Sequence, residues 1–159
     1  MMESRQYRGA APVGHLDELP PLEMTTIVYL RMWCGGGASR EQVRNDFILA
    51  FGYSTGSLHS ATFSSFMMLL IHKSRRKIMR HQTHCQYFGG DESAVANMIA
   101  AAAAGDVDDA LLLASHLVPA DVVEELINPA EQIGLAFDQM LGQFHTKFMP
   151  THKTPNSKH

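Results

Sequence analysis

Residue types that bind metals are gathered in a short run near the middle of the chain. Residues 79–85 (MRHQTHC) contain His81, His84 and Cys85, and the only other cysteine of the sequence is Cys34. Histidine nitrogens and cysteine thiolates are the usual ligands of zinc, and four of them complete a closed structural site. These four residues therefore form a candidate structural zinc site, which would stabilise the fold without catalysing a reaction.

The spacing of these residues leaves an alternative open. Strong zinc-binding sequences contain two local pairs of ligands, whereas only one local group is present here. The neighbouring His84 and Cys85 are also awkward as joint ligands, because adjacent side chains usually diverge. In the alternative, the two cysteines are small buried apolar residues and the two histidines lie on the surface.

Residues 41–60 (EQVRNDFILAFGYSTGSLHS) resemble the helix-turn-helix DNA-binding motif, in which a turn containing glycine joins two helices. With Gly52 as the turn glycine, apolar residues fall where the motif needs them: Phe47, Phe51, Tyr53, Leu58 and Ala61. The resemblance covers about 20 of the 159 residues and implies that the second helix presents polar side chains to DNA. Those side chains are Thr55, Ser57, His59, Ser60 and Thr62.

Two features depart from the motif. Ile48 stands where a small residue is expected, and the second helix carries no Lys or Arg until its end. Because phosphate contacts supply much of the affinity for DNA, basic residues are needed nearby. A basic stretch about 20 Å away along the helix could provide them: Lys73, Arg75, Arg76, Lys77 and Arg80. The alternative is two core helices followed by a solvated basic loop.

Complete catalytic motifs do not occur in the sequence. The glycines at 35–37 lack the Gly-Lys-Ser/Thr that completes a phosphate-binding loop, and neither G-x-S-x-G nor H-E-x-x-H is present. Cys85, next to His84 and close to Arg80, could be a nucleophile or redox sensor, but the sequence shows no base and no group that orients one. Whether the chain is an enzyme therefore stays open, and interaction or regulation is favoured over catalysis.

The elements that must position these residues are helices, because apolar residues recur every three or four positions between Gly and Pro breaks. Helices are predicted at 22–33, 39–51, 55–73, 91–104, 106–117, 119–127 and from 129 onward. Ser39 and Asp91 are expected to cap helices, and Asn128-Pro129 to open the last one. We predict an all-α, single-domain bundle of five to seven helices, with residues 63–71 (FSSFMMLLI) at the centre of its core.

The ends of the chain are expected to lie outside that bundle. Residues 1–20 lack periodicity and end in two prolines, which predicts a flexible arm, and residues 149–159 form a polar tail that we expect to be disordered. The helical domain would then cover residues 21–148. A basic, irregular segment is expected at 74–90, between two of its helices.

Composition bounds the setting and the partners. Two cysteines suit a reducing cytoplasm, and no apolar run reaches the roughly 18 residues of a membrane span. The net charge of −3 divides into +4 for residues 1–80 and −7 for residues 81–159. This division indicates either a basic face for an anionic partner or two halves whose fields partly cancel. Residues 55–71 are apolar on many sides, which favours a homodimer.

Two further tracts carry resemblances. Residues 89–118 (GGDESAVANMIAAAAAGDVDDALLLASHLV) and 79–85 are similar to uncharacterised small helical proteins of alphaproteobacteria, which implies an all-α fold and a bacterial cytoplasmic setting but no activity. Residues 101–117 look like the centre of a tetratricopeptide repeat. Because that pattern does not recur 34 residues away on either side, we expect a single helical hairpin instead of a repeat array.

Overall fold

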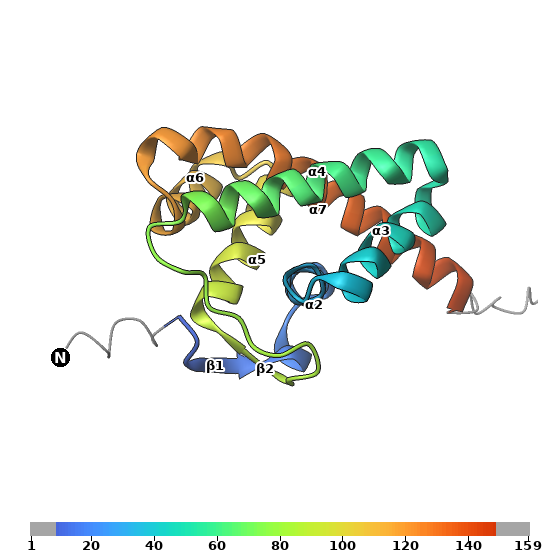
Figure 1. The fold of residues 1–159 in the computed structure, drawn as a ribbon, viewed down its shortest axis with the longest axis horizontal. Helices are drawn as coiled ribbons and strands as arrows, with labels where there is room; N and C mark the ends of the chain where they lie inside the picture. Colours follow the sequence, from blue (N-terminus) through green and yellow to red (C-terminus); the bar gives the residue numbers. More distant parts are fainter. Residues whose placement is uncertain (1–8, 149–159) are drawn as a thin grey trace, which may run out of the picture.

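The computed structural model describes residues 9–148, and six α-helices form most of that range (Figure 1). The helices are α2 (Pro21–Cys34), α3 (Gly37–Phe51), α4 (Tyr53–Lys73), α5 (Gly90–Ala103), α6 (Val107–Leu117) and α7 (Ala120–Phe148). A two-stranded sheet of β1 (Pro12–His15) and β2 (Tyr87–Gly89) and a short 3-10 helix, η1 (Leu16–Glu18), complete the fold. The prediction of an all-α, single-domain bundle is therefore confirmed, with a small sheet added.

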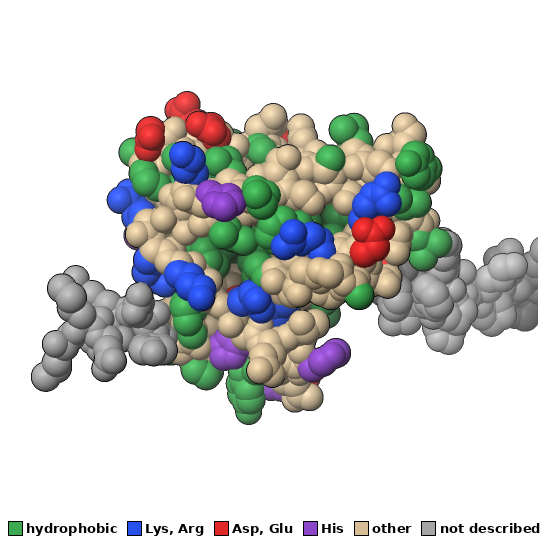
Figure 2. Space-filling view, in the orientation of Figure 1, with side chains coloured by type: hydrophobic (Ala, Val, Ile, Leu, Met, Phe, Trp, Pro, Cys, Tyr) green, Lys and Arg blue, Asp and Glu red, His purple; other side chains and the backbone are tan. Residues whose placement is uncertain are grey.

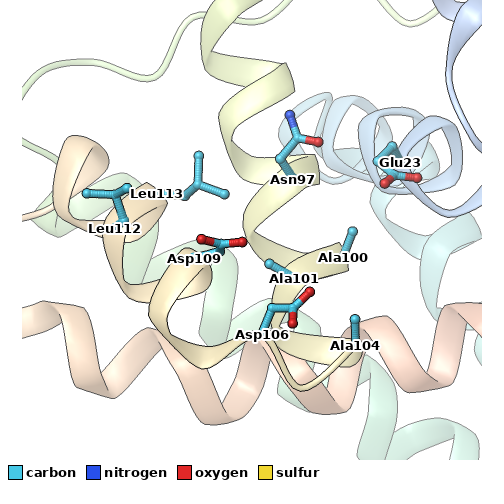
Figure 3. A pocket seen from close by; sticks show the side chains of 9 residues that line it. All are labelled: Glu23, Asn97, Ala100, Ala101, Ala104, Asp106, Asp109, Leu112 and Leu113. Carbon is cyan, nitrogen blue, oxygen red and sulfur yellow. The ribbon is translucent and has the colours of Figure 1, made fainter.

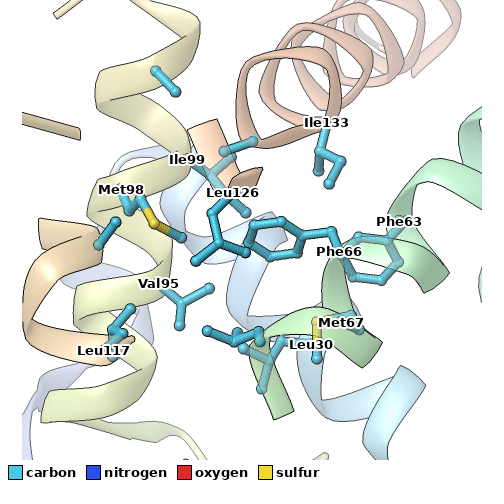
Figure 4. Close-up of a cluster of buried hydrophobic side chains, with 14 of the residues drawn as sticks. Leu30, Phe63, Phe66, Met67, Val95, Met98, Ile99, Leu117, Leu126 and Ile133 are labelled. Carbon is cyan, nitrogen blue, oxygen red and sulfur yellow. The ribbon is translucent and has the colours of Figure 1, made fainter. Parts of the chain in front are cut away.

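The core lies around α4, which packs against α3 and α7 and contributes several of the largest buried side chains. Phe63, Phe66, Met67 and Leu70 are buried and meet residues of α2, α5 and α7 (Figure 4). The remaining apolar residues of this run do not all point inward. Met68 is 46% exposed and Ile71 is 40% exposed, so α4 leaves an apolar edge on the surface.

The structure differs from the prediction at the amino end. Residues expected to belong to a flexible arm form β1 and η1, and β1 pairs antiparallel with β2, with Pro12 opposite Gly89 and His15 opposite Tyr87. Both strands are too short to show alternation in the sequence, and an irregularity in β1 interrupts their pairing. Residues 1–8 of the arm and the tail at 149–159 lie outside the described residues.

The second difference is α7, which is one helix of 29 residues with Pro129 inside it, where two helices were predicted. Proline removes one backbone hydrogen bond from a helix interior. The apolar stripe nevertheless stays in phase across the proline, at Val122, Leu126, Ala130 and Ile133, and all four side chains are buried. Burial of this continuous stripe outweighs the local cost of the proline.

A single residue, Gly52, joins α3 to α4, and its φ of 84° lies in the left-handed region that glycine tolerates. The close approach of the two helices depends on Gly56, since a Cβ there would lie 2.5 Å from Cα of Ile48. The small residue that lets the two helices cross is therefore Gly56 on α4. The helix-turn-helix motif instead requires a small residue on the first helix, at position 48, which is Ile48 in α3.

Ser39 does not cap α3 as predicted. The helix begins two residues earlier, after Gly36, and the hydroxyl of Ser39 donates instead to the carbonyl of Met32 at 2.8 Å. Gly89 is likewise the residue before α5, so Asp91 is not its cap. Both polar side chains are used in contacts between elements, which local capping rules do not describe.

Candidate functional site

The four residues of the predicted zinc site are only partly brought together. Sγ of Cys85 lies 3.5 Å from Nδ1 of His81, whereas His84 is exposed and Cys34 lies at the end of α2. Within residues 9–148, no three His, Cys, Asp or Glu side chains are arranged to hold a metal ion. The structure therefore gives the structural zinc site no support.

The polar residues predicted to face DNA are largely used within the fold. The ring of His59 packs against Phe51, with centroids 4.6 Å apart, and burial lowers the pKa of His59. Ser60 is buried, Ser57 and Thr62 are half-buried, and only Thr55 is exposed. The start of α4 thus offers few of the predicted contacts to a nucleic acid, and DNA binding stays a prediction.

The basic residues at the end of α4 and after it divide into two groups. Arg76 forms two hydrogen bonds with the buried carboxylate of Asp91, at 2.8 and 2.5 Å, and Nε of Arg75 donates to the carbonyl of Ser115. These two hold the segment at residues 74–86, which we call the connector, against α5 and α6. Lys73, Lys77 and Arg80 are exposed.

A fully buried ion pair also fixes the connector, and sequence reasoning missed it. Nε and Nη2 of Arg31 donate to the carboxylate of Glu92 at 2.5 and 3.1 Å, and both side chains are 0% exposed. The same guanidinium donates to the carbonyls of Cys85 and Tyr87, each at 2.7 Å. One signal was present in the sequence: Arg31 is a charged residue within the apolar second half of α2 (residues 27–34), and a charge buried there needs a partner.

With the connector held in this way, a groove of about 330 Å³ lies between it, α2 and α4. Its apolar lining consists of Leu30, Trp33, Cys34, Met67, Met68, Leu70, Ile71 and Ile78. Its charged lining is entirely basic among the described residues and consists of Arg40, Lys77 and Arg80. Lys and Arg side chains surround a patch of hydrophobic side chains on this face (Figure 2). We call this site the α2–α4 groove.

Trp33 forms part of the floor of the groove and is the single tryptophan of the chain. The guanidinium of Arg40 lies over its ring, 3.8 Å from the centroid, and the indole N–H donates to the hydroxyl of Ser64. Next to it, burial raises the pKa of the Cys34 thiol, although Arg80 and Arg40 oppose that shift. Arg80 also donates to the carbonyl of Cys34, which ties the connector to the end of α2.

A second hollow, of about 500 Å³, lies between α5 and α6 and has the opposite charge (Figure 3). Glu23, Asp106 and Asp109 supply carboxylates above a surface of small alanines. Asp106 and Asp109 lie at the amino end of α6, where the helix dipole favours negative charge. Their position is thus explained by the stability of α6, and the hollow shows no further feature of a binding site.

Comparison of the chain with protein-family models, with curated proteins and with solved structures found no match. The similarity to alphaproteobacterial proteins stays a prediction. None of the helices in the described range combines the length and the apolar character that a bilayer span requires. Function is therefore inferred from the geometry of the α2–α4 groove.

Proposed function

We propose that this chain is a non-enzymatic interaction protein that binds an acidic amphipathic helix of a partner protein in the α2–α4 groove. The observation that carries the proposal is the combination of an apolar cavity with a rim of Arg40, Lys77 and Arg80 and with no carboxylate in its described lining. A cluster of like charges around apolar surface favours a ligand that carries negative charge beside apolar side chains.

The apolar part of the groove suits the side chains of a helix. Met68 and Ile71 stand partly exposed at its edge, and Met67 lies beneath them. Methionine side chains are unbranched and polarizable, so they adapt to differently shaped ligands. An amphipathic helix places apolar anchors at intervals of three and four residues along one face, which matches a groove of this kind.

The extent of the positive charge favours a peptide over a small anion. Lys73 and Arg75 continue the basic character beyond the groove, at the end of α4 and the start of the connector, whereas the charge of Arg76 is compensated by Asp91. A small carboxylate would reach only the rim, whereas a helix several turns long spans both regions. Duplex DNA would contact the cations but leave the apolar floor without a partner.

Trp33 offers a direct measurement, because its emission reports the groove and no other tryptophan contributes. We would titrate the full chain with a designed helix of about five turns that carries Leu on one face and Glu on the other. The same peptide with Lys in place of Glu is the control. The Glu peptide is expected to change the Trp33 emission and to bind more weakly as salt is raised.

Charge reversal locates the binding surface. The double variant Lys77→Glu/Arg80→Glu is expected to weaken binding of the Glu peptide by at least about tenfold at low salt. Arg44→Glu is the matched control, since Arg44 lies outside the groove and pairs only with Glu41 among the described ion pairs. Equal binding of the Glu and Lys peptides, or equal affinity in the double variant and the wild type, would contradict the proposal.

Two other outcomes would assign the groove differently. If duplex DNA alone changes the Trp33 emission, with a steep dependence on salt, the helix-turn-helix interpretation replaces the proposal. If the protein forms dimers that the double variant dissociates, and the Glu peptide does not bind, the occupant is a second copy of this chain. Sedimentation of the free protein measures that last outcome.

A further inference from the structure

His81 and Cys85 form a thiol–imidazole pair in the connector, outside the lining of the α2–α4 groove. The thiol sulfur lies 3.5 Å from Nδ1 of the ring. The other ring nitrogen, Nε2, lies 2.7 Å from the carbonyl oxygen of Ala10. Three groups are thus in line: a nucleophile, a base and a group that orients the base.

The hydrogen bond to Ala10 determines where the protons are. A backbone carbonyl only accepts hydrogen bonds, so Nε2 of His81 must carry its hydrogen. In the neutral ring the lone pair is then on Nδ1, which faces Cys85. The thiol of Cys85 is therefore the donor, and its proton points at a base that can take it.

The backbone on both sides of the pair is fixed. The carbonyl of Cys85 accepts a hydrogen bond from the buried Arg31, and the backbone N–H of Cys85 donates to the carbonyl of Gln82 at 2.9 Å. Next to Ala10, the carbonyl of Gly9 accepts from the N–H of Asp91 at 3.0 Å. Cys85 itself is half-buried, and these contacts set the position of its sulfur relative to the base.

We propose that Cys85 is a reactive thiol with His81 as its general base, and that low-molecular-weight disulfides modify it reversibly. In the forward step the proton of the Cys85 thiol passes to Nδ1 of His81, and the thiolate attacks one sulfur of the disulfide. That S–S bond breaks as the new one forms. The leaving thiolate takes a proton from the imidazolium, and a mixed disulfide on Cys85 and one free thiol remain.

Cys34 is the internal comparison. It has no imidazole partner among the described residues, and burial raises the pKa of its thiol, which keeps it in the unreactive protonated form. One chain therefore holds a cysteine with a base and a cysteine without one. The modified residue would lie on the connector that also carries Lys77 and Arg80 of the groove.

The test compares single-cysteine variants in the otherwise full chain. In Cys34→Ser only Cys85 remains, and in Cys85→Ser only Cys34 remains. Each folded variant is mixed with the disulfide 5,5′-dithiobis(2-nitrobenzoate) near neutral pH, and the released thiolate is followed by absorbance. Cys85 is expected to react at least about tenfold faster than Cys34, and His81→Gln in the Cys34→Ser background is expected to remove about tenfold of that rate.

His84→Gln is the matched control, because His84 is exposed and adjacent to Cys85 but is not the residue paired with it. An equal loss of rate in the His84 and His81 variants, or equal rates for the two cysteines, would overturn the proposal. If the His81 variant fails to fold, the rate in urea decides. Cys85 must react faster in the folded protein than in the unfolded chain. A slower reaction in the folded protein would also overturn the proposal.

Discussion

Arg31 donates four hydrogen bonds from inside the core, to the carboxylate of Glu92 and to two backbone carbonyls. One guanidinium thus connects α2, the end of the connector, β2 and α5. A buried ion pair adds little net stability by itself, because both charges lose their hydration. Removing one partner of the pair costs much more stability, because the remaining charge then stays buried without compensation.

Glu92→Gln is therefore expected to lower the free energy of unfolding by about 3–5 kcal/mol. Urea denaturation followed by circular dichroism measures the change. Glu41→Gln is the control, because its pair with Arg44 is exposed and should contribute less than about 1 kcal/mol. Similar losses in the two variants would show that the Arg31–Glu92 pair is not essential to the core.

A second single residue, His59, is expected to make the stability of the fold depend on pH. Burial against the Phe51 and Phe47 rings lowers its pKa below the ordinary 6.5, so the unfolded chain binds more protons than the folded protein between those two pKa values. The stability contributed by neutral His59 is present above pH 6.5 and is lost as the pH falls through the folded-state pKa. His59→Gln should therefore lose less stability than the wild type between pH 7 and pH 5, and equal losses in denaturant titrations would contradict this.

Between elements, the contact of α3 with α4 depends on Gly56. Alanine is the better helix former by about 1 kcal/mol, but a Cβ at this position would lie 2.5 Å from both Cα of Ile48 and the carbonyl oxygen of Phe47. Gly56→Ala is expected to destabilise the protein by about 1–3 kcal/mol, because backbone atoms must shift. Thermal unfolding measures this.

The control for that substitution is Gly142→Ala in α7, where nothing lies within 4 Å of the added Cβ. There the gain in helix propensity should raise stability by up to about 1 kcal/mol. A stabilised Gly56→Ala variant would show that the two helices have room to separate.

The elements themselves could largely be predicted from the sequence, because apolar spacing and Gly breaks are local signals. The predictions failed where contacts between residues distant in the sequence determine the structure. Pro129 was expected to divide a helix, but the buried stripe continues through it. For the same reason the α2–α4 groove was not predicted: Lys77 and Arg80 were identified as basic residues, whereas their position beside Trp33 depends on how the connector folds back.

The candidate thiol site shows the same limit. The sequence placed His84 next to Cys85, and the structure pairs Cys85 with His81, four residues away. What selects His81 is the carbonyl of Ala10, 71 residues away in the chain. No local pattern contains that contact.

At the scale of the whole molecule, charge is unevenly distributed along the chain, with +4 for residues 1–80 and −7 for residues 81–159. Basic side chains surround the α2–α4 groove, and acidic ones gather at the edge of the same view (Figure 2). This arrangement would steer an acidic partner toward the groove before contact. The homodimer expected from residues 55–71 stays a prediction; the exposed large apolar side chains of that segment, which such a contact could cover, are Leu58, Met68 and Ile71.

The pairing of β1 with β2 also sets an order of events during synthesis. The side chains of His15, in β1, and Gln86, the residue before β2, are hydrogen-bonded and are 71 residues apart. At 5–20 residues per second, a ribosome needs roughly 4–14 s to make the chain between them. The helices α2, α3 and α4 are complete before β2 exists, so the nascent protein carries an unpaired β1 throughout that interval. The first strand to leave the ribosome therefore waits for its partner while three helices are made, and it can pair before α5, α6 and α7 have been synthesised.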